Sequence, residues 1–518
     1  MSELWRPRVN PWWIAAAVML ATFMEVLDTS IASVALPYIG GNLGATPSEA
    51  TWVLTSYLVS NAIVLPASGW LSRFFGRKRL LLTCIVIFSA SSFLCGAATT
   101  LPMLIIARVL QGAGGGALQP LAQSIMLESF PPAKRGTAMA VYGIGVVCAP
   151  ILGPTLGGWL TDTWSWRWAF YINVPVSVIA VVMISLFVDD PPWIRNDKPG
   201  QIDTVGLGFM SIGLGALQII LDKGQEVDWF GAIWLRWLAG LCVGSLLFFV
   251  YWELRVSDPI VNLRIFKDRN FLVACALFFL FGAAIYGLIT LQPLFLQTLL
   301  GYTALEAGLT VSPRGLGAFL ALFVVGALIA RVGGRRLAAF GFVAFSVSAY
   351  LLCRLNLQMS RVTLLFPNII SGFGAGFIFV PLTTVGLGTL GTSQIGNAAG
   401  IQNLVRNIGG SVGISFVSTM LERFAQAHQV FMVDRVSALS PIYRQQAGRL
   451  QGFFQNHFSP ADARLRAEAV IYNVVHQQTA YWAFIELFYD FMWLGLACAV
   501  GVWLLREVKS SGRGVAAH

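Results

Sequence analysis

Two acidic residues near the middle of the first apolar segment are the residues best able to do chemistry. Glu25 and Asp28 are three positions apart, so on a helix they share one face. A carboxyl group at mid-membrane costs about 2.5–3.5 kcal/mol on insertion scales, and burial favours its neutral form. Two such neighbours titrate as a coupled pair. Their type and spacing predict a proton-carrying site, and the alternative is a structural hydrogen bond between helices.

A third charged residue, Arg108, lies in the fourth apolar segment and keeps its proton. It must be paired or hydrated there, and glycines at 112 and 114–116 allow another helix to approach closely. A fixed cation beside the first helix favours the ionised form of Asp28. Arg108 is therefore predicted to belong to the proton-coupling site, and the alternative is a structural bond to a backbone carbonyl.

The elements that hold these residues follow from composition. Hydrophobic residues make up 56% of the chain and charged residues 11%, whereas soluble domains carry about 25% charged residues. Lipid must therefore cover most of the chain, and runs of roughly 20 apolar residues without period-two alternation are membrane-spanning helices. We expect an all-α integral membrane protein with fourteen such helices, at approximately 12–39, 50–71, 80–99, 102–127, 137–161, 169–188, 203–221, 231–252, 270–298, 304–330, 337–356, 361–388, 396–421 and 481–505.

Lysine and arginine concentrate on one side of these helices, which holds 20 of the 34 such residues, among them Arg73, Arg77, Lys78, Arg79, Lys134, Arg135, Arg331, Arg335, Arg336 and Arg506. The short loops opposite hold Arg167, Lys223, Arg354 and Arg361. The positive-inside rule makes the first side cytoplasmic, with both termini there. The net charge of +10 is thus a topology signal, and its scatter through short loops argues against nucleic-acid binding.

Two internal matches indicate a duplicated chain. The basic turn GWLSRFFGRKRL at 69–80 has a weaker copy, GALIARVGGRRL, at 326–337, and the segment 108–116 matches 368–376. Duplication of this kind is typical of transporters. We predict a six-helix bundle at 1–188, linkers with two inserted helices at 189–269, a second six-helix bundle at 270–506 and a cytoplasmic tail at 507–518.

Other residues at membrane depth are candidates for conformational change or ligand binding. Gly145, Gly153, Pro154, Gly157 and Gly158 predict a bent helix in tight contact with another. Arg314 and Arg406 could attract an anionic substrate or pair internally, and Glu486 and Asp490 share a face near the outer end of the last helix. Candidate substrate-binding residues, for which the alternative is ordinary packing, are Tyr57, Asn61, Gln111, Gln123, Tyr286, Gln292, Asn403 and Arg406.

The sequence lacks the residues that several kinds of chemistry require. The seven cysteines fall in apolar runs without a CxxC pair, and the four histidines lie outside the predicted helices. The chain has no P-loop, HExxH or GxSxG motif. We therefore expect no metal site, no cofactor and no enzyme activity.

One predicted loop, 422–480, is unusually long, and long loops are functional or disordered. Its part from 461 to 478 has helical spacing of Leu465, Ala469, Ile471 and Val475. The segment is either a docking surface for a partner outside the cytoplasm or a solvated spacer.

Together the motifs resemble the major facilitator superfamily, and within it the fourteen-helix drug:proton antiporters. The segments that carry the resemblance are LDTSIASVALP at 27–37, GWLSRFFGRKR at 69–79, LIIARVLQGAGGG at 104–116 and APILGPTLGG at 149–158. WSWRWAFYINVP at 164–175 and DPIVNLRIFKDRNF at 258–271 resemble the EmrB-like branch.

The resemblance implies roles for particular positions. Asp28 and Arg108 would belong to the proton-coupling apparatus. The cytoplasmic gate motif would comprise Gly69, Gly76, Arg77, Lys78 and Arg79, and the antiporter motif Gly153, Pro154, Gly157 and Gly158. One position departs from the pattern, because Ser72 stands where the gate motif usually has an acid.

The resemblance also implies a function. The chain would be the inner-membrane pump of a tripartite system, exchanging protons for diverse toxic small molecules, with a periplasmic adaptor of the EmrA type and an outer-membrane channel of the TolC type as partners. The alternatives are a proton-coupled exporter of one metabolite, such as a siderophore, fatty acid or amino acid, and a non-transporting membrane sensor.

Overall fold

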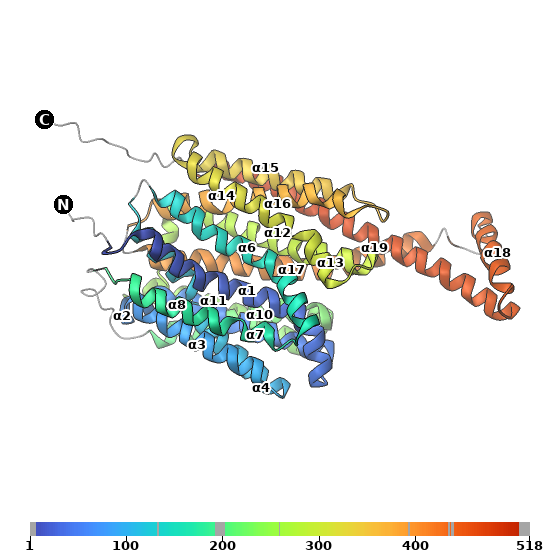
Figure 1. The fold of residues 1–518 in the computed structure, drawn as a ribbon, viewed down its shortest axis with the longest axis horizontal. Coiled ribbons are helices and arrows are strands. Elements are labelled where there is room, and N and C mark those ends of the chain that lie inside the picture. The colour runs from blue at the N-terminus through green and yellow to red at the C-terminus, as the bar shows by residue number, and fades with distance from the viewer. Residues whose placement is uncertain are drawn as a thin grey trace.

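The computed structural model describes residues 7–131, 134–191, 203–257, 259–391, 394–433, 436 and 440–506. The predicted tail at 507–518 and most of the first linker, 192–202, lie outside these residues. Within the described part the regular structure is helical (Figure 1). Thirteen helices are long and apolar enough to cross a membrane. The remaining predicted span, 137–161, lies within the 29-residue helix α6.

The helices before residue 190 pack with one another, α1 against α6 and α4 against α2 and α3. Two of the predicted spans in this set are interrupted helices, the fourth divided into α4 and α5 and the sixth into α7 and α8. The elements are α1 (Pro11–Leu43), α2 (Pro47–Phe75), α3 (Arg77–Ala97), α4 (Leu101–Gly115), α5 (Leu118–Ser129), α6 (Arg135–Thr163), α7 (Trp168–Tyr171) and α8 (Asn173–Phe187).

The helices after residue 268 form a second set, in which α16 packs against α14 and α15 and α12 packs against α17. Its elements are α12 (Arg269–Leu300), α13 (Ala304–Val311), α14 (Pro313–Val332), α15 (Gly334–Cys353), α16 (Arg361–Gly388), α17 (Ile395–Val433), α18 (Pro441–Gln455) and α19 (Pro460–Gly501). Between the sets lie α10 (Thr204–Lys223) and α11 (Ile233–Arg255), and α10 packs on both α2 and α17. The two sets meet where α6 packs on α14 and α2 packs on α17.

Backbone details repeat between the two sets at the spacing of the basic turns. The four glycines with positive φ form two pairs, Gly44 with Gly301 (both 66°) and Gly76 (83°) with Gly333 (90°). Only glycine adopts such angles without strain. Capping boxes also repeat, with Thr46 and Glu49 starting α2 and Thr303 and Glu306 starting α13. The repetition therefore extends to helix ends that the sequence motifs do not cover.

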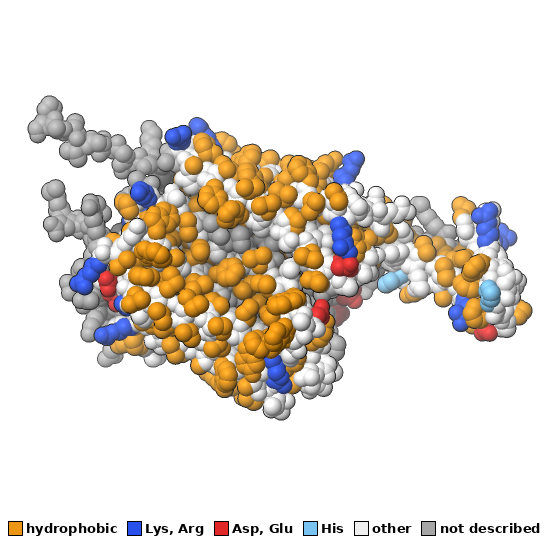
Figure 2. All heavy atoms as spheres, in the orientation of Figure 1, with side chains coloured by type: hydrophobic (Ala, Val, Ile, Leu, Met, Phe, Trp, Pro, Cys, Tyr) orange, Lys and Arg blue, Asp and Glu red, His pale blue; other side chains and the backbone are white. Residues whose placement is uncertain are grey.

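The surface divides as a membrane protein requires. Figure 2 shows apolar side chains over the middle of the body and Lys and Arg side chains at its two ends. Large apolar residues on the outer faces of α8 and α11 are well exposed, for example Leu186 at 67% and Leu247 at 66%. Such a band suits lipid and not water. We call the end that carries the loops 73–79 and 331–336 the basic end, and the opposite one the α18 end.

The segment 422–480 is largely helical. Helix α17 continues to Val433 and α19 begins at Pro460, so the predicted spans 396–421 and 481–505 are the inner parts of longer helices. A helix of 42 residues, as α19 is, is about 63 Å long at 1.5 Å per residue, twice the thickness of a bilayer core. Helix α18 packs on α19, and the two project beyond the body at the α18 end, while the rest of α19 packs on α15 and α17 (Figure 1). We call the described residues of 422–480 the arm.

Candidate functional site

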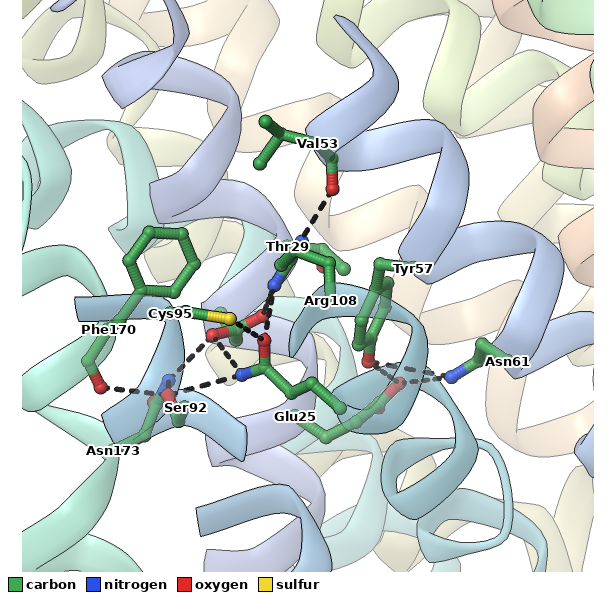
Figure 3. Close-up of polar contacts among 12 residues, drawn as sticks. Glu25, Thr29, Val53, Tyr57, Asn61, Ser92, Cys95, Arg108, Phe170 and Asn173 are labelled. Atoms are coloured by element: carbon green, nitrogen blue, oxygen red, sulfur yellow. Dashed lines mark hydrogen bonds and ion pairs between the residues drawn. The ribbon is translucent and has the colours of Figure 1, made fainter. Parts of the chain in front are cut away.

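Asp28 lies in a closed polar network inside the first helix set. The carboxylate is fully buried and forms an ion pair with Arg108, with 2.6 Å between Oδ2 and Nη1. Its Oδ1 accepts hydrogen bonds from Gln111 Nε2 at 2.9 Å and Asn173 Nδ2 at 2.6 Å. These donors come from α4 and α8, so two helices converge on one carboxylate of α1 (Figure 3). Both charges of the pair are compensated, as a buried ion pair requires.

Arg108 is held from several directions. Besides Asp28, its guanidinium donates from Nε to the carbonyl of Val53 at 2.9 Å and from Nη1 to Gln111 Oε1 at 2.8 Å. The guanidinium carbon lies 4.4 Å from the centre of the Tyr57 ring and 5.4 Å from that of Phe170, within the range of a cation–π interaction. Arg108 thus has both the predicted ion pair with an acid and the predicted bond to a backbone carbonyl. Together they fix the orientation of its guanidinium.

Two members of this network were missed by sequence reasoning. Ser92 donates to the carbonyl of Phe170 at 2.9 Å and accepts from Gln111 at 3.2 Å and Asn173 at 3.0 Å. Asn173 is the first residue of α8, directly after the interruption that separates it from α7. The segment 164–175 contains Asn173 and was noticed only as a family signature. A serine and an asparagine on apolar helices carry no stronger signal.

Glu25 lies one helical turn from Asp28 and has different neighbours. It is 4% exposed and accepts hydrogen bonds from three neutral donors, Tyr57 Oη at 3.1 Å, Asn61 Nδ2 at 3.2 Å and Gln119 Nε2 at 2.6 Å. No ion pair joins Glu25 to a cation among the described residues. The predicted pair of acids thus consists of one charge-compensated carboxyl and one that is solvated by neutral groups.

Gln119 connects Glu25 to the second helix set. Its Nε2 donates to Glu25, and its Oε1 accepts from Arg406 Nη2 at 2.5 Å. All three side chains are buried, and they come from α1, α5 and α17. One turn further along α5, Gln123 accepts from Asn403 of α17 at 2.8 Å. Two hydrogen bonds therefore join α5 to α17, and only the first continues to an acidic residue.

The eight predicted substrate-binding residues do not form one cluster. Tyr57, Asn61 and Gln111 are bound to the two acids. Gln123, Asn403 and Arg406 join the two helix sets. Tyr286 packs on Gly410, where an added Cβ would lie 2.7 Å from its ring, and Gln292 accepts from Arg314 at 2.5 Å. Their role as substrate ligands stays a prediction.

The basic turn at 69–79 joins the helix sets at the basic end. An added Cβ on Gly69 would lie 2.9 Å from Asn397 Cα of α17, so only glycine allows this approach. A cavity of about 260 Å³ beside it is lined by Ser72, Arg73, Arg77, Asn262 and Gly396, among others. The turn is therefore part of the contact between the sets.

Position 72 of the basic turn carries no acid, and two acids from elsewhere in the chain contact the turn. Arg77 forms a buried ion pair with Glu128 at the end of α5. Asp190 accepts from the backbone N–H of Lys78 at 2.8 Å, and Lys78 Nζ donates to the carbonyl of Ser185 at 2.7 Å. Ser72 itself donates to the carbonyl of Gly69. Arg77 thus has an acidic partner, and a second acid accepts from the backbone of the turn, although the usual acid is absent.

The glycine-rich part of α6 contacts two other helices. An added Cβ on Gly153 would lie 2.2 Å from Ser30 Oγ, and one on Gly157 would lie 3.2 Å from Ile31 of α1. Pro154 and Gly158 lie beside Gly308 and Leu305 of α13. The predicted close packing of this segment is observed, and it places α6 between α1 and the second helix set.

These features define a class of protein: a multi-pass membrane protein of two repeated helix sets, with buried charges at their centres and polar links between them. The chain matches the family model of the Major Facilitator Superfamily over residues 18–414. It belongs to the major facilitator superfamily and is a transporter, which confirms the predicted family and fold class.

Relatives refine the assignment. The chain is 39% identical to the multidrug export protein EmrB of Escherichia coli K12, with 84% of this chain and 85% of that one covered. It is 36% identical to the fatty acid resistance protein FarB of Neisseria gonorrhoeae, with 97% of both chains covered. The fold resembles the crystal structure of the human organic anion transporter MFSD10, with a TM-score of 0.61 at 14% identity, covering 96% of this chain and 100% of that one.

Proposed function

We propose that this chain exports structurally diverse toxic small molecules in exchange for protons, as a secondary active transporter of the inner membrane that needs no cofactor. The observation that carries the proposal is the pair of buried acids on α1, one bound to Arg108 and one linked through Gln119 to the other helix set. Such residues inside a membrane mark ion and proton pathways. The names of relatives such as EmrB of Escherichia coli support multidrug export.

The basic end is proposed to face the cytoplasm, with both chain termini there, and the α18 end to face the periplasm. The positive-inside rule supports this orientation, because the arginines and lysines of 73–79 and 331–336 lie at one end. We also propose that the two bundles comprise 1–188 and 270–506, with α10 and α11 as an insertion. The packing of each helix set within itself supports these limits.

Protonation of the acids would change specific bonds. A proton on Asp28 cancels its charge and weakens the pair with Arg108, which frees that guanidinium. A proton on Glu25 weakens the charge-assisted bond from Gln119. Because the same Gln119 amide accepts from Arg406, its hold on the second bundle would weaken as well. We therefore propose that Gln119 is a positioning residue that couples the charge of Glu25 to the contact between bundles.

Transport would proceed by alternating access, in which the bundles rock about a central site. The contacts of Gly69 with Asn397 and of Gln123 with Asn403 join the two helix sets, and we propose that they hold the cytoplasmic side closed. Opening toward the cytoplasm must break them. Gly69, Gly76, Arg77, Lys78 and Arg79 are proposed to form the gate, and the glycines and Pro154 of α6 the surface on which the bundles move.

The arm is proposed to bind a periplasmic adaptor of the EmrA type, and through it an outer-membrane channel of the TolC type. Its support is shape and chemistry, since it projects from the body (Figure 2) and exposes Ile442 (73%), Phe453 (64%) and Leu465 (65%). Replacing these three residues with serine should abolish co-purification of an adaptor and leave proton-coupled transport in vesicles intact. Unchanged co-purification would contradict the docking proposal.

The proposed function is tested by drug-induced proton release from proteoliposomes with an imposed pH gradient. Candidate drugs should collapse the gradient with the native protein and fail to do so with Asp28→Asn. Exchange with one metabolite only would favour a specific exporter, for which the name of FarB offers a precedent in fatty acids. Drug binding without proton movement would favour a sensor and overturn the proposal.

A further inference from the structure

A cluster around Arg314, in the second helix set, has a positive charge and nothing to balance it. The guanidinium is 1% exposed, and its hydrogen-bond partners are the amide oxygens of Gln292 at 2.5 Å and Asn368 at 3.3 Å. Arg314 belongs to α14, Gln292 to α12 and Asn368 to α16. No acidic side chain pairs with this cation among the residues that the structure describes.

The cluster also has donors in excess. Arg314 Nε, Arg314 Nη1 and Gln292 Nε2 are buried and have no acceptor within the described chain. Asn368 is fully used, because its Nδ2 donates to the carbonyls of Thr310 and Leu364. A buried donor without a partner costs about 1–3 kcal/mol, and more when it is charged. The cluster therefore lacks hydrogen-bond acceptors and a negative charge.

Among the residues that the structure describes, three other buried cations each have an acidic partner, and a fourth, Arg406, donates to an amide that binds an acid. Arg108 has Asp28, Arg77 has Glu128 and Lys223 has Glu226. Arg406 reaches Glu25 through Gln119. A lone buried charge is expensive and is kept where it serves an ion or substrate.

We propose that the Arg314 cluster is the binding site for the anionic head group of the transported molecule, with amphipathic carboxylates as the substrate class it favours. The carboxylate would supply both the negative charge and the acceptor atoms that the three free donors lack. The alkyl or aromatic part would lie against the apolar helices around it. This inference rests on the proposed export function and specifies the substrate of the same transporter.

The backbone beside Arg314 suits a site that must open. Helices α13 and α14 are separated at Ser312, and Pro313 directly precedes the arginine. A proline at a helix break is a place where the chain can bend without losing many hydrogen bonds. Bending there would move the guanidinium relative to Gln292 and Asn368, which belong to other helices.

The test measures binding of three probes that share a decyl chain and differ in head group: decanoate, decyltrimethylammonium and decanol. The full chain is placed in lipid nanodiscs at pH 8, and titration calorimetry is corrected with empty nanodiscs. Arg314→Gln should weaken decanoate binding by about tenfold or more and leave the other probes within about twofold. Arg314→Lys should retain most of the decanoate affinity. Arg354→Gln, at an exposed arginine near the end of α15, is the matched control and should change nothing.

A second variant covers the case in which Arg314→Gln does not fold. Gln292→Glu places an acid on the cluster and should also abolish the preference for decanoate. Equal weakening of all three probes, or undiminished decanoate binding by both variants, overturns the proposal. Since nanodiscs hold no gradient, this outcome is independent of proton exchange. A native protein that moves no protons with any drug would instead remove the export function while leaving the carboxylate preference measurable.

Discussion

The two helix sets place buried charge at related positions and balance it differently. By the spacing of the basic turns Arg314 corresponds to Tyr57, and by that of the fourth-helix motif Asn368 corresponds to Arg108. In the first set the cation on α4 meets Asp28 of α1. In the second set the cation, Arg314, lies on α14 and is hydrogen-bonded only to amide oxygens. The cation of the first site pairs with an acid of the chain, and the cation of the second pairs with none among the described residues.

This difference suggests a division of labour between the halves of a duplicated chain. The Asp28 carboxylate has a cation within the chain while it is ionised, and protonation of Asp28 releases that cation. A cation with no carboxylate can accept one from outside the chain. In the proposal made above, the repeated helices provide the same frame in both halves, and the half without an acid beside its buried cation binds the substrate.

Removing the cation tests the comparison most severely. Arg108→Met leaves Asp28 buried without its partner and should destabilise the protein by about 3–5 kcal/mol. Arg314→Met removes a charge that has no counter-ion and should be neutral or stabilising. Thermal unfolding in nanodiscs measures both. A loss of stability for Arg314→Met as large as that for Arg108→Met would show that the second site is also balanced within the chain.

Glycines at related positions of the two basic turns should differ in effect. Gly69→Ala places a Cβ 2.9 Å from Asn397 Cα, so closure of the basic end should be hindered and transport should fall about tenfold or more. Gly326→Ala meets Ala140 at an ordinary 3.5 Å and should retain nearly native transport. Vesicle uptake assays compare the two. Equal loss would mean that the contact with Asn397 is not what makes Gly69 special.

The two glutamines of α5 allow the coupling of Glu25 to the second helix set to be distinguished from simple contact between the sets. Gln119→Ala and Gln123→Ala each remove one hydrogen bond to α17. Of these two glutamines, only Gln119 is hydrogen-bonded to Glu25. Gln119→Ala should therefore shift the pH profile of transport, whereas Gln123→Ala should lower the transport rate without shifting the profile.

Charged and titratable groups around Glu25 are Asp28 on α1 with Arg108, Tyr57 on α2, Tyr142 on α6, Tyr286 on α12 and Arg406 on α17. Neither substitution changes these groups, so a difference between the two pH profiles reports the loss of the bond between Gln119 and Glu25. Identical pH profiles for Gln119→Ala and Gln123→Ala would contradict the relay.

The smallest expected effect is one that the two halves share. Thr46→Ala and Thr303→Ala each remove the side chain of a capping box and should cost about 1 kcal/mol of stability. Similar shifts in the unfolding temperature would show that the repeated frame is equivalent in both halves, so that the difference lies in the buried charges. Strongly unequal shifts would argue against that equivalence.

Much of the frame could be predicted from the sequence, because apolar runs and basic turns are local patterns. The spans around Glu25, Asp28 and Arg108 were located correctly, and Asp28 meets Arg108 as expected. Interruptions such as those between α4 and α5 were missed, because glycine runs and prolines are also tolerated inside membrane helices. The arm was predicted as a loop with some helical spacing, since exposed polar helices lack the long apolar run by which spans are recognised.

The composition of the site was less predictable. Gln119, Ser92 and Asn173 are single polar residues on apolar helices, and their partners lie 19 to 287 positions away. Which neutral side chain meets which charge depends on helix rotation, which one sequence does not fix. The contacts of Glu128 and Asp190 with the basic turn have the same origin, because both acids come from distant parts of the chain.

The most direct test of the account follows protons and substrates together in proteoliposomes, using decanoate and ethidium as anionic and cationic probes. With Asp28→Asn, neither probe should collapse an imposed pH gradient faster than it does in protein-free liposomes, where decanoic acid itself carries some protons across the bilayer. With Arg314→Gln, ethidium should still exchange for protons and decanoate should not. Proton exchange driven by either probe in Asp28→Asn would contradict the assignment of the first site, and equal loss of both probes in Arg314→Gln would contradict the division between the two halves.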